Sequence, residues 1–376
     1  MKSILLLPLF SMPSGHQHVA EALRTHILQL CPQAIVHKID LLEYGFGHIE
    51  KWVSSLYMQW INRSPGSYGY LYQYVVGRNK PAANVYAIYR ILFLQTLVEI
   101  IAKTKPDIIF CTHSLPSYLC GQLKKQKRLN VPVVNVYTDF LIHQLWDCNY
   151  TDIHFLPDRL ASSHLLRRNE VHGEIVITGI PVDRTMTEGS QLRLGQSRQM
   201  KLPRRPLILV AGGHAGAGGI EQILRQLEGR QCDYLVLCGK NKSLFDSINR
   251  LKQPAFRALG YISDKQQMLQ IYESADAMIT KAGGVTMSEC LLCMLPIFIY
   301  HSLPGQETHN VRHLLAQQVL STFDFSRPLE AQIVERLFDL NEMKQRNAKL
   351  ERYRAQFFDP ISEATHLSQA LRSLLK

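Results

Sequence analysis

Residues 277–289 read Ala277-Met278-Ile279-Thr280-Lys281-Ala282-Gly283-Gly284-Val285-Thr286-Met287-Ser288-Glu289. This stretch predicts a buried strand that ends at Thr280, a tight turn at the glycine pair, and a helix that follows at once. A helix that begins at the carboxyl edge of a parallel sheet favours an anionic ligand. Glu289 lies about one turn into that helix, where its carboxylate can accept hydrogen bonds from two ribose hydroxyls or simply complement the helix dipole.

A second glycine-rich turn lies upstream, in Leu209-Val210-Ala211-Gly212-Gly213-His214-Ala215-Gly216-Ala217-Gly218-Gly219-Ile220. It also follows an apolar run and precedes a helical pattern. Small residues here either let backbone amides approach a ligand or only permit tight packing.

Short apolar runs alternate with helical patterns in both halves of the chain. Continuous apolar strands separated by helices are typical of parallel sheets that are covered on both faces. The pattern therefore predicts two doubly wound α/β domains. The predicted strands are Ile4–Leu9, Ile35–Ile39, Asp107–Cys111, Val133–Tyr137, Ile153–Leu156, Ile175–Thr178, Leu207–Ala211, Tyr234–Cys238, Arg257–Leu259, Ala277–Thr280 and Ile297–Tyr300.

The domain division follows from a polar, basic stretch with little apolar periodicity. We expect a first domain over residues 1–182, a linker over 183–205 and a second domain over 206–345. Residues 346–376 read as C-terminal helices that pack back on the first domain.

Two further turns carry polar side chains at the expected carboxyl edges of the sheets. The segment His301–Asn310 includes Pro304-Gly305 followed by Gln306, Glu307 and Asn310, and sugar hydroxyls need such donors and acceptors. In the first half, Gly15-His16 follows the first strand, and His16 is suited to take a proton near neutral pH.

Asp139 follows the predicted strand Val133–Tyr137 at the same edge as His16. Its carboxylate can orient His16, serve as the base itself, or cap a helix. His143 and Trp146 lie four and seven positions further on and share a face if the segment is helical.

The composition fits a globular protein with anionic partners. The 376 residues carry a net charge of +11, which favours nucleotides, acidic lipids or nucleic acid, but the chain shows no nucleic-acid-binding motif.

The spacing of the eight cysteines predicts neither a disulfide framework nor a zinc site, and the lone Cys290/Cys293 pair reads as core packing. The apolar N-terminus contains Pro8 and reads as a strand rather than a leader, and no run is long enough for a transmembrane helix.

Residues 51–98 contain no Asp or Glu and are crowded with aromatic side chains, among them Trp52, Tyr57, Trp60, Tyr68 and Tyr70. A basic helix with an apolar, aromatic face suits a bilayer interface, although such a face also packs commonly on a domain core. We expect this stretch to attach the protein to anionic membrane.

Several motifs in the same order resemble glycosyltransferase family 28, and most closely the processive diacylglycerol β-glucosyltransferases and monogalactosyldiacylglycerol synthases. The matching segments are Met278–Glu289, Pro304–Asn310, Lys105–Ile109, Val136–Trp146, Ile177–Val182, Cys238–Asn241 and Leu259–Ile262. The resemblance implies a GT-B fold, in which two Rossmann-like domains face each other across a cleft, with a UDP-sugar bound by the second domain.

The resemblance also implies roles for single residues. Glu289 would hold the ribose, Gln306 and Glu307 the sugar hydroxyls, and Ile262 would offer backbone groups to uracil. His16 and Asp139 would be the catalytic pair, and Trp146 would lie with the aromatic stretch on the acceptor side. The remaining expected donor contacts are Gly213, His214, Thr280, Gly283, Gly284, Val285, Thr286 and Asn310.

The sequence therefore predicts a cytoplasmic enzyme, bound peripherally to the cytoplasmic face of the membrane. It would transfer glucose or galactose, with inversion and without a metal or other cofactor, from a UDP-sugar to diacylglycerol. Two alternatives stay open: transfer to a polyprenyl-linked cell-wall intermediate, and a non-catalytic UDP-sugar-binding protein at the membrane.

Overall fold

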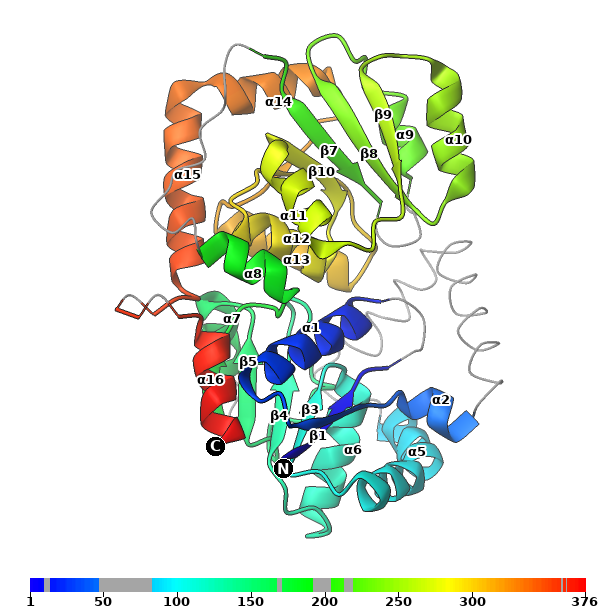
Figure 1. The fold of residues 1–376 in the computed structure, drawn as a ribbon, viewed down its shortest axis with the longest axis vertical. Helices are drawn as coiled ribbons and strands as arrows, with labels where there is room; N and C mark the ends of the chain where they lie inside the picture. The colour runs from blue at the N-terminus through cyan, green and yellow to red at the C-terminus, as the bar shows by residue number, and fades with distance from the viewer. Residues whose placement is uncertain are drawn as a thin grey trace. The chain divides into compact units, whose positions relative to one another are not determined.

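A computed structural model describes residues 1–9, 14–46, 83–167, 171–191, 204–212, 219–359, 361–362 and 364–376. The chain forms two compact units, each with its own sheet (Figure 1). The first unit comprises Met1–Arg184, Pro304–Gln306 and Gln356–Lys376, and the second comprises Thr185–Leu303 and Glu307–Ala355.

The first unit contains a six-stranded parallel sheet in the order β2-β1-β3-β4-β5-β6. Its central strands are buried along their whole length, because helices cover both faces of a doubly wound sheet. The strands are β1 Ser3–Leu7, β2 Ile35–Lys38, β3 Ile108–Cys111, β4 Val133–Val136, β5 Ile153–Leu156 and β6 Glu174–Ile177.

Helices follow most of these strands, as a doubly wound topology requires. The C-terminal helix α16, red in Figure 1, packs beside α1 and β6 and so belongs to the first unit. The described helices of this unit are α1 Gly15–Leu30, α2 Leu41–Phe46, α5 Ala83–Thr104, α6 Ser114–Lys125, α7 Arg159–Leu166 and α16 His366–Leu375.

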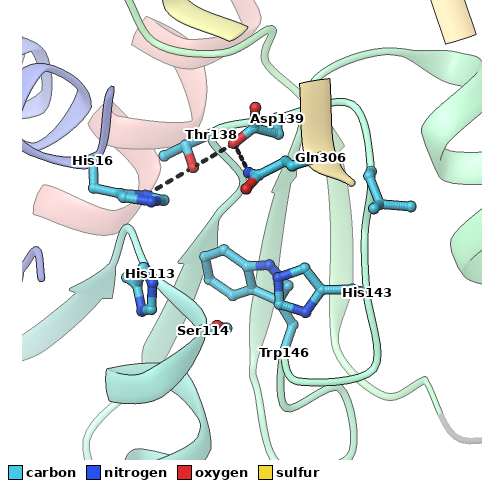
Figure 2. A pocket seen from close by; sticks show the side chains of 9 residues that line it. His16, His113, Ser114, Thr138, Asp139, His143, Trp146 and Gln306 are labelled. Carbon is cyan, nitrogen blue, oxygen red and sulfur yellow. Dashed lines mark hydrogen bonds between the residues drawn. The ribbon is translucent and has the colours of Figure 1, made fainter. Parts of the chain in front are cut away.

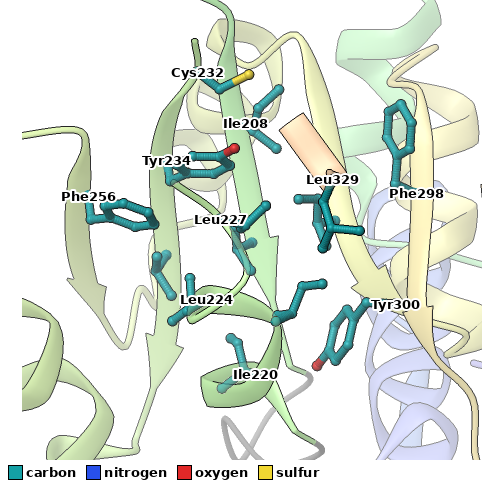
Figure 3. Close-up of a cluster of buried hydrophobic side chains, with 14 of the residues drawn as sticks. Ile208, Ile220, Leu224, Leu227, Cys232, Tyr234, Phe256, Phe298, Tyr300 and Leu329 are labelled. Carbon is teal, nitrogen blue, oxygen red and sulfur yellow. The ribbon is translucent and has the colours of Figure 1, made fainter. Parts of the chain in front are cut away.

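The second unit contains another six-stranded parallel sheet, in the order β12-β11-β10-β7-β8-β9. Figure 3 shows its core, in which Ile208, Tyr234, Phe298 and Leu329 lie among other buried apolar side chains. The strands are β7 Leu207–Ala211, β8 Asp233–Gly239, β9 Phe256–Gly260, β10 Ala277–Lys281, β11 Ile297–His301 and β12 Ser321–Thr322. The helices are α8 Arg184–Gln191, α9 Ile220–Leu224, α10 Lys242–Leu251, α11 Lys265–Ser274, α12 Gly284–Leu292, α13 Gln306–Ala316, α14 Leu329–Phe338 and α15 Leu340–Ala355.

The strand order identifies one topological switch point in each sheet. In the first sheet β1 lies between β2 and β3, and in the second β7 lies between β8 and β10. Loops that leave the carboxyl ends of β1 and β3, or of β7 and β10, therefore diverge to opposite faces and open a crevice. Three of the turns expected to carry the chemistry, those after β1, β7 and β10, are such loops.

The predicted strands are all present, and the structure adds the short edge strand β12. The stretch expected to be a linker begins with the helix α8, because Met186, Thr187 and Ser190 are buried on one of its faces. Helix α15 belongs to the second unit, whereas residues from Gln356 onward belong to the first.

Cys290 is fully buried, as expected for a cysteine packed in the core. Among the described residues, no helix is both long enough and apolar enough to cross a membrane.

Candidate active site

His16 is the second residue of α1 and lies directly after the switch-point strand β1. The side chain of Ser14 caps this helix by accepting a hydrogen bond from the Gln17 N–H at 3.4 Å. The cap begins the helix at Gly15, so the imidazole of His16 lies at the carboxyl edge of the sheet. His18, two positions further on, is exposed.

The His16 ring is held by a main-chain carbonyl. Its Nδ1 lies 2.8 Å from the carbonyl oxygen of Thr112, the residue that follows β3. A carbonyl only accepts, so the neutral ring carries its proton on Nδ1 and Nε2 is its basic atom. Burial lowers the pKa of His16 to about 4, against the opposing effect of the Thr112 hydrogen bond. The imidazole is therefore neutral at pH 7.

Thr138 links His16 to Asp139. The Thr138 Oγ1 lies 3.0 Å from His16 Nδ1 and 3.4 Å from Asp139 Oδ2. Its hydroxyl can share the Nδ1 proton as an acceptor and donate its own proton to the carboxylate. The residues between β4 and β5 contain no helix, so Asp139 does not serve as a helix cap. The two predicted catalytic residues thus lie in one network, with Thr138 between them.

A second imidazole lies against the first. The rings of His16 and His113 are 4.6 Å apart between centroids and meet edge to face at 82°. His113 caps α6, because its Nδ1 accepts the Leu115 N–H at 3.1 Å, so its proton resides on Nε2. Burial lowers the pKa of His113 well below its usual value, and His16 and His143 lower it further. Two neutral imidazoles therefore share this edge of the sheet.

These groups line a pocket of the first unit, drawn in Figure 2. The pocket contains about 270 Å³ of empty space, part of it open to solvent. The segment after Asp139 is not helical, yet His143 and Trp146 both reach the pocket. The Trp146 indole is fixed by Tyr137, with ring centroids 4.7 Å apart. The lining residues are His16, His113, Ser114, Thr138, Asp139, Leu141, His143, Trp146 and Gln306.

Gln306, expected to hold sugar hydroxyls, lines this pocket of the first unit. It belongs to the first unit together with Pro304 and Gly305. Its side-chain amide donates a hydrogen bond to Asp139 Oδ2, as Figure 2 shows. The structure therefore brings Gln306 together with His16 and Asp139.

The glycine turn of the second unit lies at the switch-point strand β10. Gly283 is the N-cap of α12 and has an ordinary φ of −78°. A Cβ added at Gly283 would meet no atom within 4 Å, so the fold itself has no need of a glycine here. The missing side chain leaves open space beside the first N–H groups of α12, where an anion would approach. Gly284 is buried, and Val285 and Thr286 are partly buried.

Two expected contacts lie behind this turn. Asn310 is fully buried, and its Nδ2 donates to the carbonyl oxygen of Ala282 at 3.1 Å. Thr280 is also buried, and its hydroxyl donates to the Lys281 carbonyl oxygen at 3.2 Å. Both side chains hold the shape of the turn.

Two carboxylates lie close to the turn. Glu289 is partly buried in the second turn of α12 and accepts a hydrogen bond from the Tyr272 hydroxyl at 2.8 Å. It lies beyond the first turn of the helix, where the influence of the helix dipole is weaker. Glu307 pairs with Lys281, whose Nζ lies 3.4 Å from Oε1, and accepts the Leu303 N–H at 2.9 Å. Lys281 places a cation beside the turn.

The remaining predicted residues divide into two groups. Ile262 lies partly buried in the loop after β9. Gly213, His214, Trp52, Tyr57, Trp60, Tyr68 and Tyr70 lie outside the described residues. In the described part of the chain, no three or more His, Cys, Asp or Glu side chains are grouped so as to hold a metal ion.

Sequence reasoning missed Thr112, Thr138, His113 and Lys281. Each of them follows or ends a predicted strand at the carboxyl edge, so strand position was the available signal. Their partners are distant in sequence, and only the fold reveals them.

Comparison with known protein families supports the two-part organisation. The model for Monogalactosyldiacylglycerol (MGDG) synthase matches residues 16–182. The model for the Glycosyltransferase family 28 C-terminal domain matches residues 207–364.

Two curated relatives cover different shares of the chain. An uncharacterized glycosyltransferase of Bacillus subtilis, YkoN, is 38% identical over 86% of this chain and 84% of its own length. A processive diacylglycerol β-glucosyltransferase of Bacillus licheniformis is 29% identical over 57% of this chain. The chain spans only 56% of the length of that second enzyme.

Solved structures resemble the chain along almost its whole length. Acinetobacter baumannii MurG has a TM-score of 0.61 and 14% identity, with 99% of this chain and 98% of that chain covered. Phytolacca americana UGT2, complexed with UDP-2-fluoro-glucose and pterostilbene, has a TM-score of 0.61 and 12% identity, with 100% and 99% covered. With the two parallel sheets, this likeness confirms the predicted GT-B fold of two doubly wound domains.

Proposed function

Since this chain belongs to the family 28 glycosyltransferases, we propose that it transfers a hexose from a UDP-sugar to a membrane lipid. The acceptor we propose is diacylglycerol, and glucose is favoured slightly over galactose. The family match to MGDG synthase and the similarity to a processive diacylglycerol β-glucosyltransferase support this choice of substrates.

The observation that carries the proposal is the hydrogen bond from His16 Nδ1 to the Thr112 carbonyl. It makes Nε2 a proton acceptor in a pocket large enough for a small polar group. The acceptor hydroxyl gives its proton to Nε2 while its oxygen attacks the anomeric carbon. The bond from that carbon to the UDP oxygen breaks, and UDP leaves with the electron pair. Attack from the face opposite UDP inverts the anomeric centre.

Asp139 acts through Thr138 in this proposal. When His16 takes the proton, the imidazolium gains stability from the carboxylate at the other end of the Thr138 hydroxyl. Gln306 holds Asp139 by a hydrogen bond, and as the resemblance implies it would also bind sugar hydroxyls. His16 is therefore the base, and Asp139 is its electrostatic support.

The second unit supplies the donor site. The diphosphate lies over the start of α12, where Gly283 leaves space and Lys281 supplies positive charge, so the leaving UDP is stabilised without a metal. Glu289 binds the ribose hydroxyls, and Glu307 binds sugar hydroxyls while it pairs with Lys281. Gly213, His214 and Ile262 complete the site as the resemblance implies.

The size of the pocket favours a lipid that presents only its headgroup. The pocket's enclosed volume of about 30 Å³ is far below the roughly 300–1,000 Å³ typical of pockets for drug-sized ligands. A glycerol hydroxyl can enter beside His16 and Trp146, while the acyl chains stay outside in the bilayer.

Peripheral attachment to the cytoplasmic face of the membrane is part of the proposal. The aromatic, basic stretch of residues 51–98 would provide it, with Trp52, Tyr57, Trp60, Tyr68 and Tyr70 at the interface. Within the described part of this stretch, Ile91 is 75% and Leu92 47% exposed on α5, beside the exposed Arg90. Liposome sedimentation should show a preference for anionic lipid that weakens with salt. Binding that ignores both lipid charge and salt would contradict the attachment.

The test of the function is a product assay. The purified protein is incubated with UDP-glucose, UDP-galactose or UDP-N-acetylglucosamine and with vesicles that contain diacylglycerol or a polyprenyl-linked acceptor. Mass spectrometry should detect a hexosyl-diacylglycerol. A product only on the polyprenyl acceptor would favour the cell-wall alternative, and UDP binding without any product would favour the non-catalytic one.

A further inference from the structure

Tyr272 and Glu289 form a buried hydrogen bond within the second unit. Tyr272 lies in the last turn of α11 and is 3% exposed, and its hydroxyl donates to Glu289 Oε2 at 2.8 Å. Glu289 lies on α12, the helix that begins at the glycine turn. The bond therefore joins the candidate ribose ligand to a helix that carries none of the residues assigned to the donor site.

The Tyr272 hydroxyl keeps its proton at neutral pH. Burial and the neighbouring Glu289 raise the pKa of Tyr272 well above its ordinary value. The hydroxyl thus stays protonated and remains a donor. Its phenol ring is buried, and the hydroxyl holds Glu289 Oε2 at 2.8 Å.

Glu289 keeps a reachable surface despite this contact. The residue is only partly buried, whereas Tyr272 is enclosed behind it. A carboxylate offers about four lone-pair sites on its two oxygens, more than one phenol donor can occupy. The remaining sites can accept hydrogen bonds from a ligand while the side chain is held in one rotamer.

We propose that Tyr272 is a positioning residue that makes the donor site selective for nucleotides with intact ribose hydroxyls. The inference rests on the proposed function, because it takes Glu289 as the ribose ligand. Without Tyr272, the Glu289 side chain would sample several rotamers, and a ribonucleotide would have to order it on binding. Tyr272 itself touches no substrate.

The experiment compares three nucleotides by isothermal titration calorimetry: UDP, 2′-deoxy-UDP and 3′-deoxy-UDP. The readout is the ratio of the deoxynucleotide Kd to the UDP Kd. For the native protein this ratio should be about tenfold or more for at least one deoxynucleotide, since hydrogen bonds to a carboxylate are charge-assisted. In Tyr272→Phe the ratio should fall below about threefold, while affinity for that deoxynucleotide changes by less than about twofold.

The matched control is Tyr234→Phe. Tyr234 is fully buried in the same unit, and its hydroxyl donates to Glu330 Oε1, also at 2.8 Å. It lies near the amino end of β8, away from the carboxyl edge. This variant should lose about as much stability as Tyr272→Phe and keep the native selectivity ratio. If loss of stability alone lowered the ratio, the ratio would fall in Tyr234→Phe as well as in Tyr272→Phe.

Glu289→Ala separates the two ways in which the idea can fail. If this variant loses the selectivity ratio but Tyr272→Phe keeps it, the donor assignment stands and the role of Tyr272 is overturned. If Glu289→Ala binds all three nucleotides like the native protein, the ribose assignment of the proposed function is wrong and the inference falls with it. If the ratio falls in Glu289→Ala and in Tyr272→Phe but not in Tyr234→Phe, the inference is supported.

Discussion

His16 Nδ1 donates a hydrogen bond to the carbonyl oxygen of Thr112, and this contact joins the two loops that leave the switch-point strands β1 and β3. A main-chain carbonyl fixes the tautomer of the ring without placing a full negative charge beside it. The ring therefore stays neutral at pH 7, with a pKa lowered to about 4 by burial.

Replacing the base is the most direct test of this arrangement. His16→Ala should lower kcat by about 10²- to 10⁴-fold, the usual contribution of a positioned general base. UDP affinity should stay within about twofold, because the nucleotide is assigned to the second unit. Kinetics with diacylglycerol vesicles and calorimetry with UDP measure the two effects, and near-normal turnover would exclude His16 as the base.

The pH dependence of kcat/KM should reflect the low pKa of His16. Activity requires the neutral ring, so kcat/KM rises with pH through about pH 4 and is nearly flat from pH 5 to 8. A histidine of ordinary pKa would instead lose about thirtyfold between pH 8 and pH 5. Initial rates across this range decide between the two profiles.

The stability of the fold should also depend on the protonation of His16. Between pH 6.5 and about pH 4 the unfolded chain protonates His16 while the folded chain does not, so the free energy of unfolding falls as pH falls. Urea denaturation at several pH values should show this slope, and His16→Ala should reduce it. An unchanged slope in the variant would contradict the lowered pKa.

The fold could be predicted from the sequence because both sheets are parallel and enclosed. Strands such as Ile4–Leu7 and Ile108–Cys111 are buried on both faces and therefore appear as continuous apolar runs. The strand β12 was missed because it consists only of Ser321 and Thr322 at the edge of the sheet. Two polar residues there carry no periodic signal.

The site could be predicted only in part. His16 and Asp139 were visible as reactive side chains after predicted strands, but the network between them was not. Thr112 and Thr138 reach His16 across 96 and 122 positions of sequence, and only the order of strands in the sheet brings them together. Local sequence also does not report that Asn310 is fully buried, which only the fold reveals.

The link through Thr138 can be tested by removing one hydroxyl. Thr138 is buried, and valine preserves its shape while it loses the contacts to His16 and Asp139. Thr138→Val should lower kcat by about tenfold and leave KM nearly unchanged, because the imidazolium loses its connection to the carboxylate. Thr138→Ser keeps the hydroxyl and should recover most of the activity. If valine and serine behave alike, the hydroxyl is not part of the mechanism.

Gly283→Ala should weaken UDP binding while it leaves the stability of the fold nearly unchanged. A Cβ at Gly283 meets no atom within 4 Å and the backbone φ is −78°, so Gly283→Ala should change the free energy of unfolding by less than about 1 kcal/mol. The added methyl group would nevertheless occupy the space assigned to the diphosphate, so UDP affinity should fall about tenfold or more.

Gly229→Ala provides the opposite case in the same unit. Gly229 has a φ of +67°, and a Cβ there would lie 2.8 Å from Ala255 and Phe256. This variant should lose about 1–2 kcal/mol or more of stability through backbone strain and crowding, and it should still bind UDP with native affinity when folded. Thermal unfolding and calorimetry on both variants give the comparison. If Gly283→Ala bound UDP normally, the open space before α12 would not be where the diphosphate lies.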